Sequence, residues 1–123
     1  MATKPLNAFT VQESNNLQVY EDYYQNEINI STSYATLFDQ ASTNGPAKQA
    51  IIYASNSAGI EATDVISLVL NGKAEDGTYP DGIIINIIGS MLPFTIDNLI
   101  VTKIRAKTSD DDAAERLSVL AFI

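Results

Sequence analysis

The feature that most constrains the fold is a succession of short β-prone segments, each closed by residues that favour turns. Isoleucine, valine and threonine are abundant, whereas the helix formers glutamate, lysine and arginine are scarce. Turn signals recur at roughly 8–12-residue intervals, a spacing typical of β-sandwiches and jelly rolls. We therefore predict an all-β protein, a single-domain β-sandwich or jelly roll with 7–9 short, mainly antiparallel strands.

The clearest expected strand runs from Leu99 to Thr108, where apolar and basic residues alternate. Its two faces are Ile100, Thr102, Ile104 and Ala106 on one side and Lys103, Arg105 and Lys107 on the other. The other expected strands are 17–21, 27–31, 48–54, 64–70, 82–89, 91–96 and 116–123.

Two segments fit either a strand or one face of a helix, namely 33–41 and 113–121. For the second we expect a strand from Arg116 to Ile123, because Val119, Phe122 and Ile123 have a stronger preference for that state. The first stays open, since its apolar residues have helical spacing but its threonines suit a strand.

The length of 123 residues predicts one domain with one core. Residues 1–16 are expected to form an extended N-terminal arm and residues 17–123 the β-sandwich domain. The arm offers only Leu6, Phe9 and Val11 as sizeable apolar anchors. We expect it to contribute more to assembly with other subunits than to the stability of the isolated fold.

Composition excludes several kinds of catalytic site. Histidine and cysteine are both absent, which removes Ser-His and Cys-His catalysis, disulfides and nearly every zinc, haem or iron–sulfur site. The formal net charge of −8 argues against binding to nucleic acid or to anionic membranes. No catalytic residue, cofactor or metal is therefore expected, and no segment looks like a signal peptide or a membrane span.

Carboxylates gather in two expected loops. Glu75, Asp76 and Asp81 lie in one, and Asp110, Asp111 and Asp112 in the other. Neither has the alternating ligand positions of a calcium loop, so we interpret both as solvated loops, with a calcium site as the alternative. A carboxylate-dependent glycosidase would also need two carboxyl groups facing each other across a cleft, which a chain of this size hardly builds.

Two further groups are candidates for an interface. Tyr20, Tyr23 and Tyr24 lie in an aromatic, acidic stretch that could pack in the core, contact another protein or form a sugar-binding platform. Lys103, Arg105 and Lys107 could pair with acidic neighbours, protect an edge strand from aggregation, or dock onto an acidic partner.

The C-terminal half resembles a known group of proteins. Residues 89–96 (GSMLPFTI) followed by 99–108 (LIVTKIRAKT) are similar to the closing strands of small virion proteins of tailed bacteriophages. Residues 51–56 (IIYASN) are similar to their mid-chain strand. The chain departs from the commoner form of these proteins in lacking a glycine next to Thr108.

The resemblance implies a non-catalytic protein that decorates or cements a phage head, made in the host cytoplasm and incorporated into the virion. Its expected partners are the major capsid protein or other virion proteins, together with further copies of itself in a homo-oligomer, most simply a trimer. The alternative is a β-sandwich module that recognises a carbohydrate or receptor in a phage tail or host-attachment apparatus. A third interpretation, a small hydrolase, would have to rest on Asp76, Asp81 and Asp110.

Overall fold

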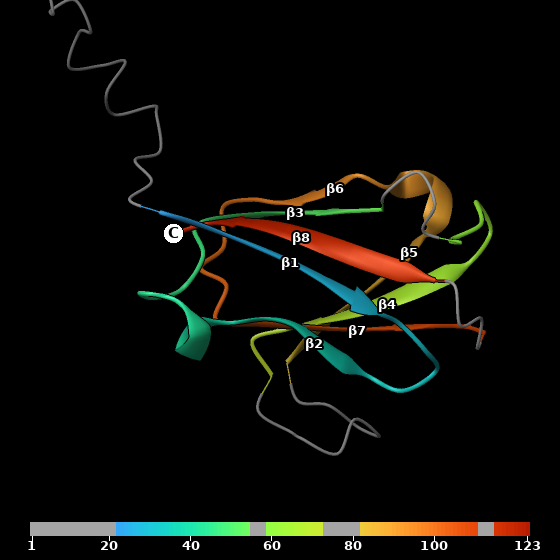
Figure 1. The fold of residues 1–123 in the computed structure, drawn as a ribbon, viewed down its shortest axis with the longest axis horizontal. Helices are drawn as coiled ribbons and strands as arrows, with labels where there is room; N and C mark the ends of the chain where they lie inside the picture. The colour runs from blue at the N-terminus through green and yellow to red at the C-terminus, as the bar shows by residue number, and fades with distance from the viewer. Residues whose placement is uncertain (1–21, 55–58, 73–81, 111–114) are drawn as a thin grey trace, which may run out of the picture.

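The chain folds into two four-stranded antiparallel sheets that pack face to face (Figure 1). The computed structural model describes residues 22–54, 59–72, 82–110 and 115–123. The prediction of an all-β sandwich is confirmed, and the helices in the described ranges are two short 3-10 turns, Gln40–Ser42 and Gly89–Met91. The strands are β1 (Tyr23–Asn29), β2 (Ala35–Asp39), β3 (Gln49–Tyr53), β4 (Val65–Leu70), β5 (Ile83–Ile88), β6 (Phe94–Ile96), β7 (Lys103–Thr108) and β8 (Arg116–Phe122).

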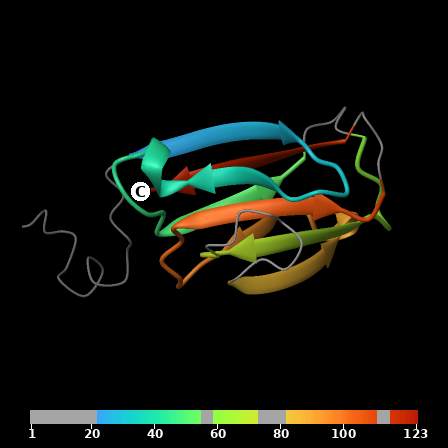
Figure 2. The same cartoon turned by 90° about the horizontal axis from the view of Figure 1, so that it is seen from below.

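The strand pairing identifies the sandwich as a jelly roll. β1 pairs with β8, β2 with β7, β3 with β6 and β4 with β5, all antiparallel. These pairings are those of one long hairpin with β1–β4 in one arm and β5–β8 in the other, folded into the sheets β1-β8-β3-β6 and β2-β7-β4-β5. Figure 2 shows the second sheet in front, with β5 at its rim.

The core lies between the sheets and follows the alternation of each strand. Ile66, Leu68 and Leu70 of β4 point inward and are fully buried, as are Ile104 and Ala106 of β7. The opposite sheet contributes Ala50 and Ile52 of β3 and Leu117, Val119 and Ala121 of β8.

A β-bulge explains why the pattern of residues 33–41 was ambiguous. The pairing of β2 with β7 shifts between Thr36 and Phe38, so that Leu37 and Phe38 are both fully buried although they are neighbours. Two adjacent buried residues break the period-two alternation of a strand, so the apolar positions of this segment resemble those on one face of a helix. The segment is strand β2, and Asp39 then caps the 3-10 turn by accepting a hydrogen bond from the backbone N–H of Ala41 at 3.0 Å.

Several expected boundaries are wrong. The strand expected at 27–31 is Tyr23–Asn29, and the one expected at 91–96 is a 3-10 turn followed by a three-residue strand. The strand expected from Leu99 starts only at Lys103. The strands expected at 48–54, 64–70, 82–89 and 116–123 are present with slightly shorter bounds, and the strand at 17–21 and the arm at 1–16 lie outside the described residues.

Asn71 is the reason that β7 starts late. Its side-chain amide donates to the carbonyl of Ile100 at 2.9 Å, and its Oδ1 accepts from the backbone N–H of Thr102 at 2.7 Å. These backbone groups therefore bond to a side chain instead of a neighbouring strand. Ile100 is 56% exposed as a result, not part of an inward face as expected.

Replacing Asn71 by alanine is expected to lower the free energy of unfolding by about 2 kcal/mol. The variant loses the three hydrogen bonds that the Asn71 side chain makes with Ile100 and Thr102, and it places alanine at a φ of 61°, which asparagine tolerates better. Urea unfolding measures the change. Asn71→Gly also loses these hydrogen bonds, but glycine adopts a positive φ without strain. Its free energy of unfolding should therefore fall by about half as much. Equal losses in the two variants would contradict the role of the left-handed φ.

Candidate functional site

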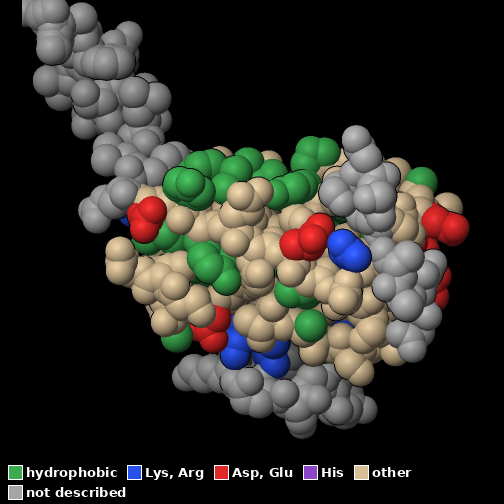
Figure 3. All heavy atoms as spheres, viewed as in Figure 1, with side chains coloured by type: hydrophobic (Ala, Val, Ile, Leu, Met, Phe, Trp, Pro, Cys, Tyr) green, Lys and Arg blue, Asp and Glu red, His purple; other side chains and the backbone are tan. Residues whose placement is uncertain are grey.

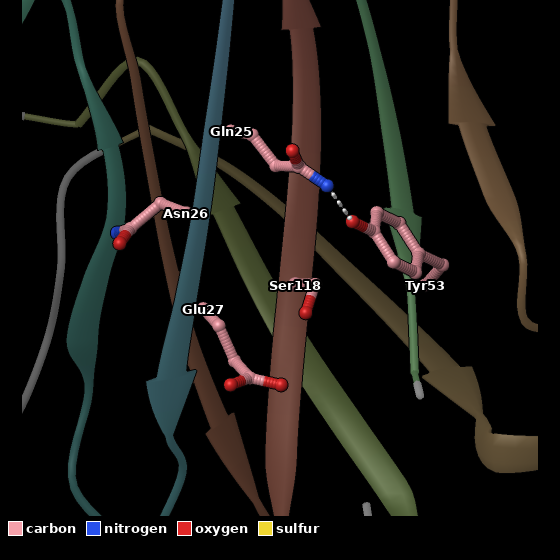
Figure 4. A pocket seen from close by; sticks show the side chains of 5 residues that line it. All are labelled: Gln25, Asn26, Glu27, Tyr53 and Ser118. Carbon is pink, nitrogen blue, oxygen red and sulfur yellow. Dashed lines mark hydrogen bonds between the residues drawn. The ribbon is translucent and has the colours of Figure 1, made fainter. Parts of the chain in front are cut away.

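A polar hollow of about 400 Å³ lies on the outer face of the β1-β8-β3-β6 sheet. Alternation directs Gln25 and Glu27 of β1, Ser118 of β8 and Tyr53 of β3 outward, because their sequence neighbours face the core. The pairing places Glu27 beside Ser118 and Ser118 beside Tyr53. Figure 4 shows these four side chains around the hollow, whereas Asn26, which also lines it, points to the other side of the sheet.

One hydrogen bond and one ion pair lie at the rim of the hollow. The amide of Gln25 donates to the Tyr53 hydroxyl at 2.6 Å. Glu27 lies 3.8 Å from the guanidinium of Arg116, with both side chains largely in solvent. On the other side of β1, the side-chain amide of Asn26 donates to the backbone carbonyl of Leu37 at 3.1 Å. This bond joins β1 to β2 of the opposite sheet.

The chemistry of the hollow is that of a recognition surface. An aromatic ring, an amide, a hydroxyl and a carboxylate can bind the hydroxyl groups of a neutral polar ligand. Among the described lining residues Glu27 is the single carboxylate. The hollow therefore does not provide the pair of carboxyl groups that glycoside hydrolysis uses.

A second cluster brings three carboxyl groups together at one end of the sandwich. Asp64 directly precedes β4, Asp110 follows β7 and Glu115 directly precedes β8. One carboxylate oxygen of each lies within 4.8 Å of the others. Glu115 is only 1% exposed and accepts a hydrogen bond from the Thr108 hydroxyl at 3.0 Å. Asp64 accepts one from the backbone N–H of Glu61 at 2.8 Å.

Burial and the hydrogen bond with Asp110 raise the pKa of Glu115 from 4.5 to about 7. The negative charge of Asp64 acts in the same direction, while the Thr108 hydroxyl opposes it. Protonation of Glu115 therefore relieves the repulsion among the carboxyl groups of this cluster. Among the described residues, these three form the group of carboxyl groups that lie close enough together to bind one divalent cation.

Sequence reasoning did not find this cluster. The sequence places Asp110 in a solvated loop, and this residue is indeed exposed, but the sequence does not indicate that it lies beside Asp64 and Glu115. A weak signal was available, because Asp64 and Glu115 are each a single carboxylate next to a strongly apolar strand. Glu75, Asp76, Asp81, Asp111 and Asp112 lie outside the described residues.

The tyrosines separate between the two faces of β1. Tyr23 is 66% exposed on the outer face. Tyr24 points inward and packs edge-on against Phe38, with 5.8 Å between the ring centroids. Tyr24 therefore packs against the core, one of the three roles considered for it, and its inward ring does not belong to an outer binding platform. Tyr20 and the arm residues Leu6, Phe9 and Val11 lie outside the described ranges.

The basic side chains of β7 share the outer face of the second sheet, as predicted. Lys103 pairs with Asp39 on the neighbouring strand at 3.9 Å, and the Lys107 ammonium lies 4.8 Å from the centre of the Tyr34 ring. Arg105 is only 3% exposed. The expectation of edge protection is wrong, because β7 lies between β2 and β4. Cross-strand pairing is confirmed for Lys103.

Apolar side chains also occur on outer faces. The pairing of β1, β8 and β3 places Tyr23 beside Phe122 and Leu120 beside Ile51, all on the side away from the core. Figure 3 shows apolar side chains gathered over this sheet. Of these four side chains Tyr23 is exposed and the other three are half-buried. Elsewhere in the described residues the large apolar side chains that are exposed are Val65, Ile83, Ile84, Ile88, Met91 and Ile100.

Comparison with known proteins finds no family model, no curated protein and no solved structure that matches this chain significantly. The strand order alone assigns the chain to a fold class, the eight-stranded jelly roll. A search of the described residues finds no helix with the length and apolar character needed to cross a membrane.

Proposed function

We propose that this protein is a non-catalytic structural subunit of a phage virion, a decoration or cement protein that stabilises the head through contacts with the major capsid protein. The observation that carries the proposal is the jelly roll, an architecture that recurs in viral capsid proteins. The fold supports a viral structural protein by analogy, and one outer face of the sandwich supports a role in protein–protein contacts.

The supporting surface is the outer face of the β1-β8-β3-β6 sheet. Its apolar row of Tyr23, Ile51, Leu120 and Phe122 lies on the side of the sheet that points away from the core. Such rows, bordered by polar residues, suit protein–protein contacts, and tyrosine is enriched there. In this proposal the protein is made in the host cytoplasm, assembles as a homo-oligomer, most simply a trimer, and binds neither nucleic acid nor membrane.

The test mixes the purified full-length protein with heads that the encoding phage assembles when this gene is deleted. We expect the protein to sediment with these heads and to raise the temperature at which they break open. A matched protein that starts at Leu17 should bind far more weakly while melting within a few degrees of the full-length protein. Heads that neither bind the protein nor gain stability would overturn the proposal.

The second candidate is a carbohydrate-binding module of a tail or host-attachment apparatus, and the polar hollow favours it. Tyr53, Gln25 and Glu27 form the combination of ring, amide and carboxylate that binds sugar hydroxyls. A glycan array discriminates the two functions. This candidate predicts binding that is lost in Tyr53→Ala and in Glu27→Gln and is unchanged in the control Thr95→Ala, at an exposed position of β6. An array without signal above background argues against it.

A further inference from the structure

β5 is the least protected edge strand of this sandwich. The backbone groups on the open side of an edge strand can pair with another chain, and most proteins block them with charges, proline, bulges or short strands. β2 carries a bulge, β6 has only three residues and follows Pro93, and β1 presents Glu27. β5 has six residues (IIINII), with no charge, no proline and an unbroken register with β4.

The ladder with β4 shows which backbone groups of β5 point outward. The N–H of Gly89 donates to the carbonyl of Asp64 at 2.9 Å, which makes these opposed residues a hydrogen-bonded pair. Because such pairs alternate along an antiparallel ladder, Ile83, Ile85 and Ile87 bond to β4. The N–H and C=O groups of Ile84, Asn86 and Ile88 therefore point away from β4, where the described part of the chain places no further strand.

The side chains of these three residues are also accessible. They lie on the outer face of the sheet, with Ile84 54% and Ile88 39% exposed. Asn86 accepts a hydrogen bond from the Ser67 hydroxyl at 2.7 Å through its Oδ1, and within the described part of the chain its amide N–H groups have no acceptor. The open edge thus combines backbone donors and acceptors with two isoleucines around one central amide.

We propose that β5 pairs antiparallel with β5 of a second copy of this chain, with Asn86 on the two-fold axis. In this register Asn86 lies opposite Asn86 of the second copy, and Ile84 lies opposite Ile88 of the second copy. Each of these pairs exchanges two backbone hydrogen bonds. The strand is self-complementary, because apolar residues meet apolar residues and no like charges are opposed, although the chain has a net charge of −8.

One strand pair covers less surface than the roughly 1,600 Å² of a standard interface. We therefore expect a weak dimer, with a Kd in the micromolar range or above, roughly 8 kcal/mol or less of binding free energy. The contact has two-fold symmetry, so it does not generate a trimer and does not rest on the proposed virion function. In a three-fold assembly it would join one trimer to the next.

Cross-linking tests the register directly, because the native chain has no cysteine. In the proposed dimer two Asn86→Cys chains place their Cα atoms about 5.5 Å apart, within the range that a disulfide spans. The matched control is Thr36→Cys, an exposed position on the bulged edge strand β2. We expect oxidised Asn86→Cys to form covalent dimers at least ten times faster than Thr36→Cys. Equal rates, or no dimer from Asn86→Cys, would overturn the proposal.

Two further measurements exclude a trivial outcome. Adding Ile84→Lys to Asn86→Cys should abolish the rapid cross-linking, whereas adding Ile100→Lys, an exposed isoleucine outside the strand, should not. Amide hydrogen exchange of the unsubstituted protein needs no variant that could misfold. The amides of Ile84, Asn86 and Ile88 should become protected as the protein concentration rises from micromolar to millimolar. Exchange that is independent of concentration contradicts the pairing.

Discussion

Replacing Glu115 by glutamine is expected to make the protein more stable than the native chain at pH 8 and about equally stable at pH 4. The pKa of Glu115 lies near 7 in the folded protein and near 4.5 when unfolded, so the folded state binds an additional proton between these values. The native free energy of unfolding therefore falls as the pH rises from about 4.5 to about 7 and does not fall further above that range. The loss is on the order of 3 kcal/mol. Glutamine keeps the acceptor for the Thr108 hydroxyl and does not ionise.

The measurement is urea unfolding of both proteins at pH 4, 5.5 and 8. The difference between the two proteins at each pH removes the contribution of the other carboxylates, which titrate in both. The control Asp110→Asn keeps Glu115 in place. It should reduce the pH dependence of the free energy of unfolding, because the hydrogen bond and the charge of Asp110 both raise the pKa of Glu115. A difference between Glu115→Gln and the native protein that stays constant from pH 4 to pH 8 would contradict this interpretation of the cluster.

Replacing Phe38 by alanine should lower the free energy of unfolding by about 4 kcal/mol. Phe38 is fully buried on β2 and contacts the ring of Tyr24 on the opposite sheet. Truncation removes the transfer free energy of the ring and leaves a cavity between the two sheets. Since domains of this size have only 5–15 kcal/mol of stability, we expect the melting temperature to fall by roughly 10–20 °C.

Calorimetry of two matched variants separates the effect of volume from that of position. Phe38→Leu keeps most of the apolar volume and should cost less than about 1.5 kcal/mol. Thr36→Ala changes an exposed side chain on the same strand and should cost about 0.5 kcal/mol or less. If Phe38→Ala melts within a few degrees of the native protein, the ring does not join the sheets as described.

The sequence alone determined the fold class and the location of most strands. Period-two alternation is a local property, so it placed Lys103 and Lys107 opposite Ile104 and Ala106 and assigned the C-terminal segment to a strand. It failed at Leu37 and Phe38, because a bulge buries two neighbours and breaks the period. It failed again at residues 99–102, where the carbonyl of Ile100 and the N–H of Thr102 bond to the side chain of Asn71, about 30 residues earlier in the chain, and Val101 pairs with Ala47.

Only the tertiary structure decided which strands became neighbours, and every candidate site depends on that choice. The hollow joins Gln25 and Glu27 to Tyr53 and Ser118, and the carboxyl cluster joins Asp64 to Asp110 and Glu115. Whether β7 is central and β5 is an edge is likewise a matter of strand order. The physical reason is that alternation fixes which face a side chain takes, whereas pairing depends on the burial of apolar faces contributed by distant parts of the chain.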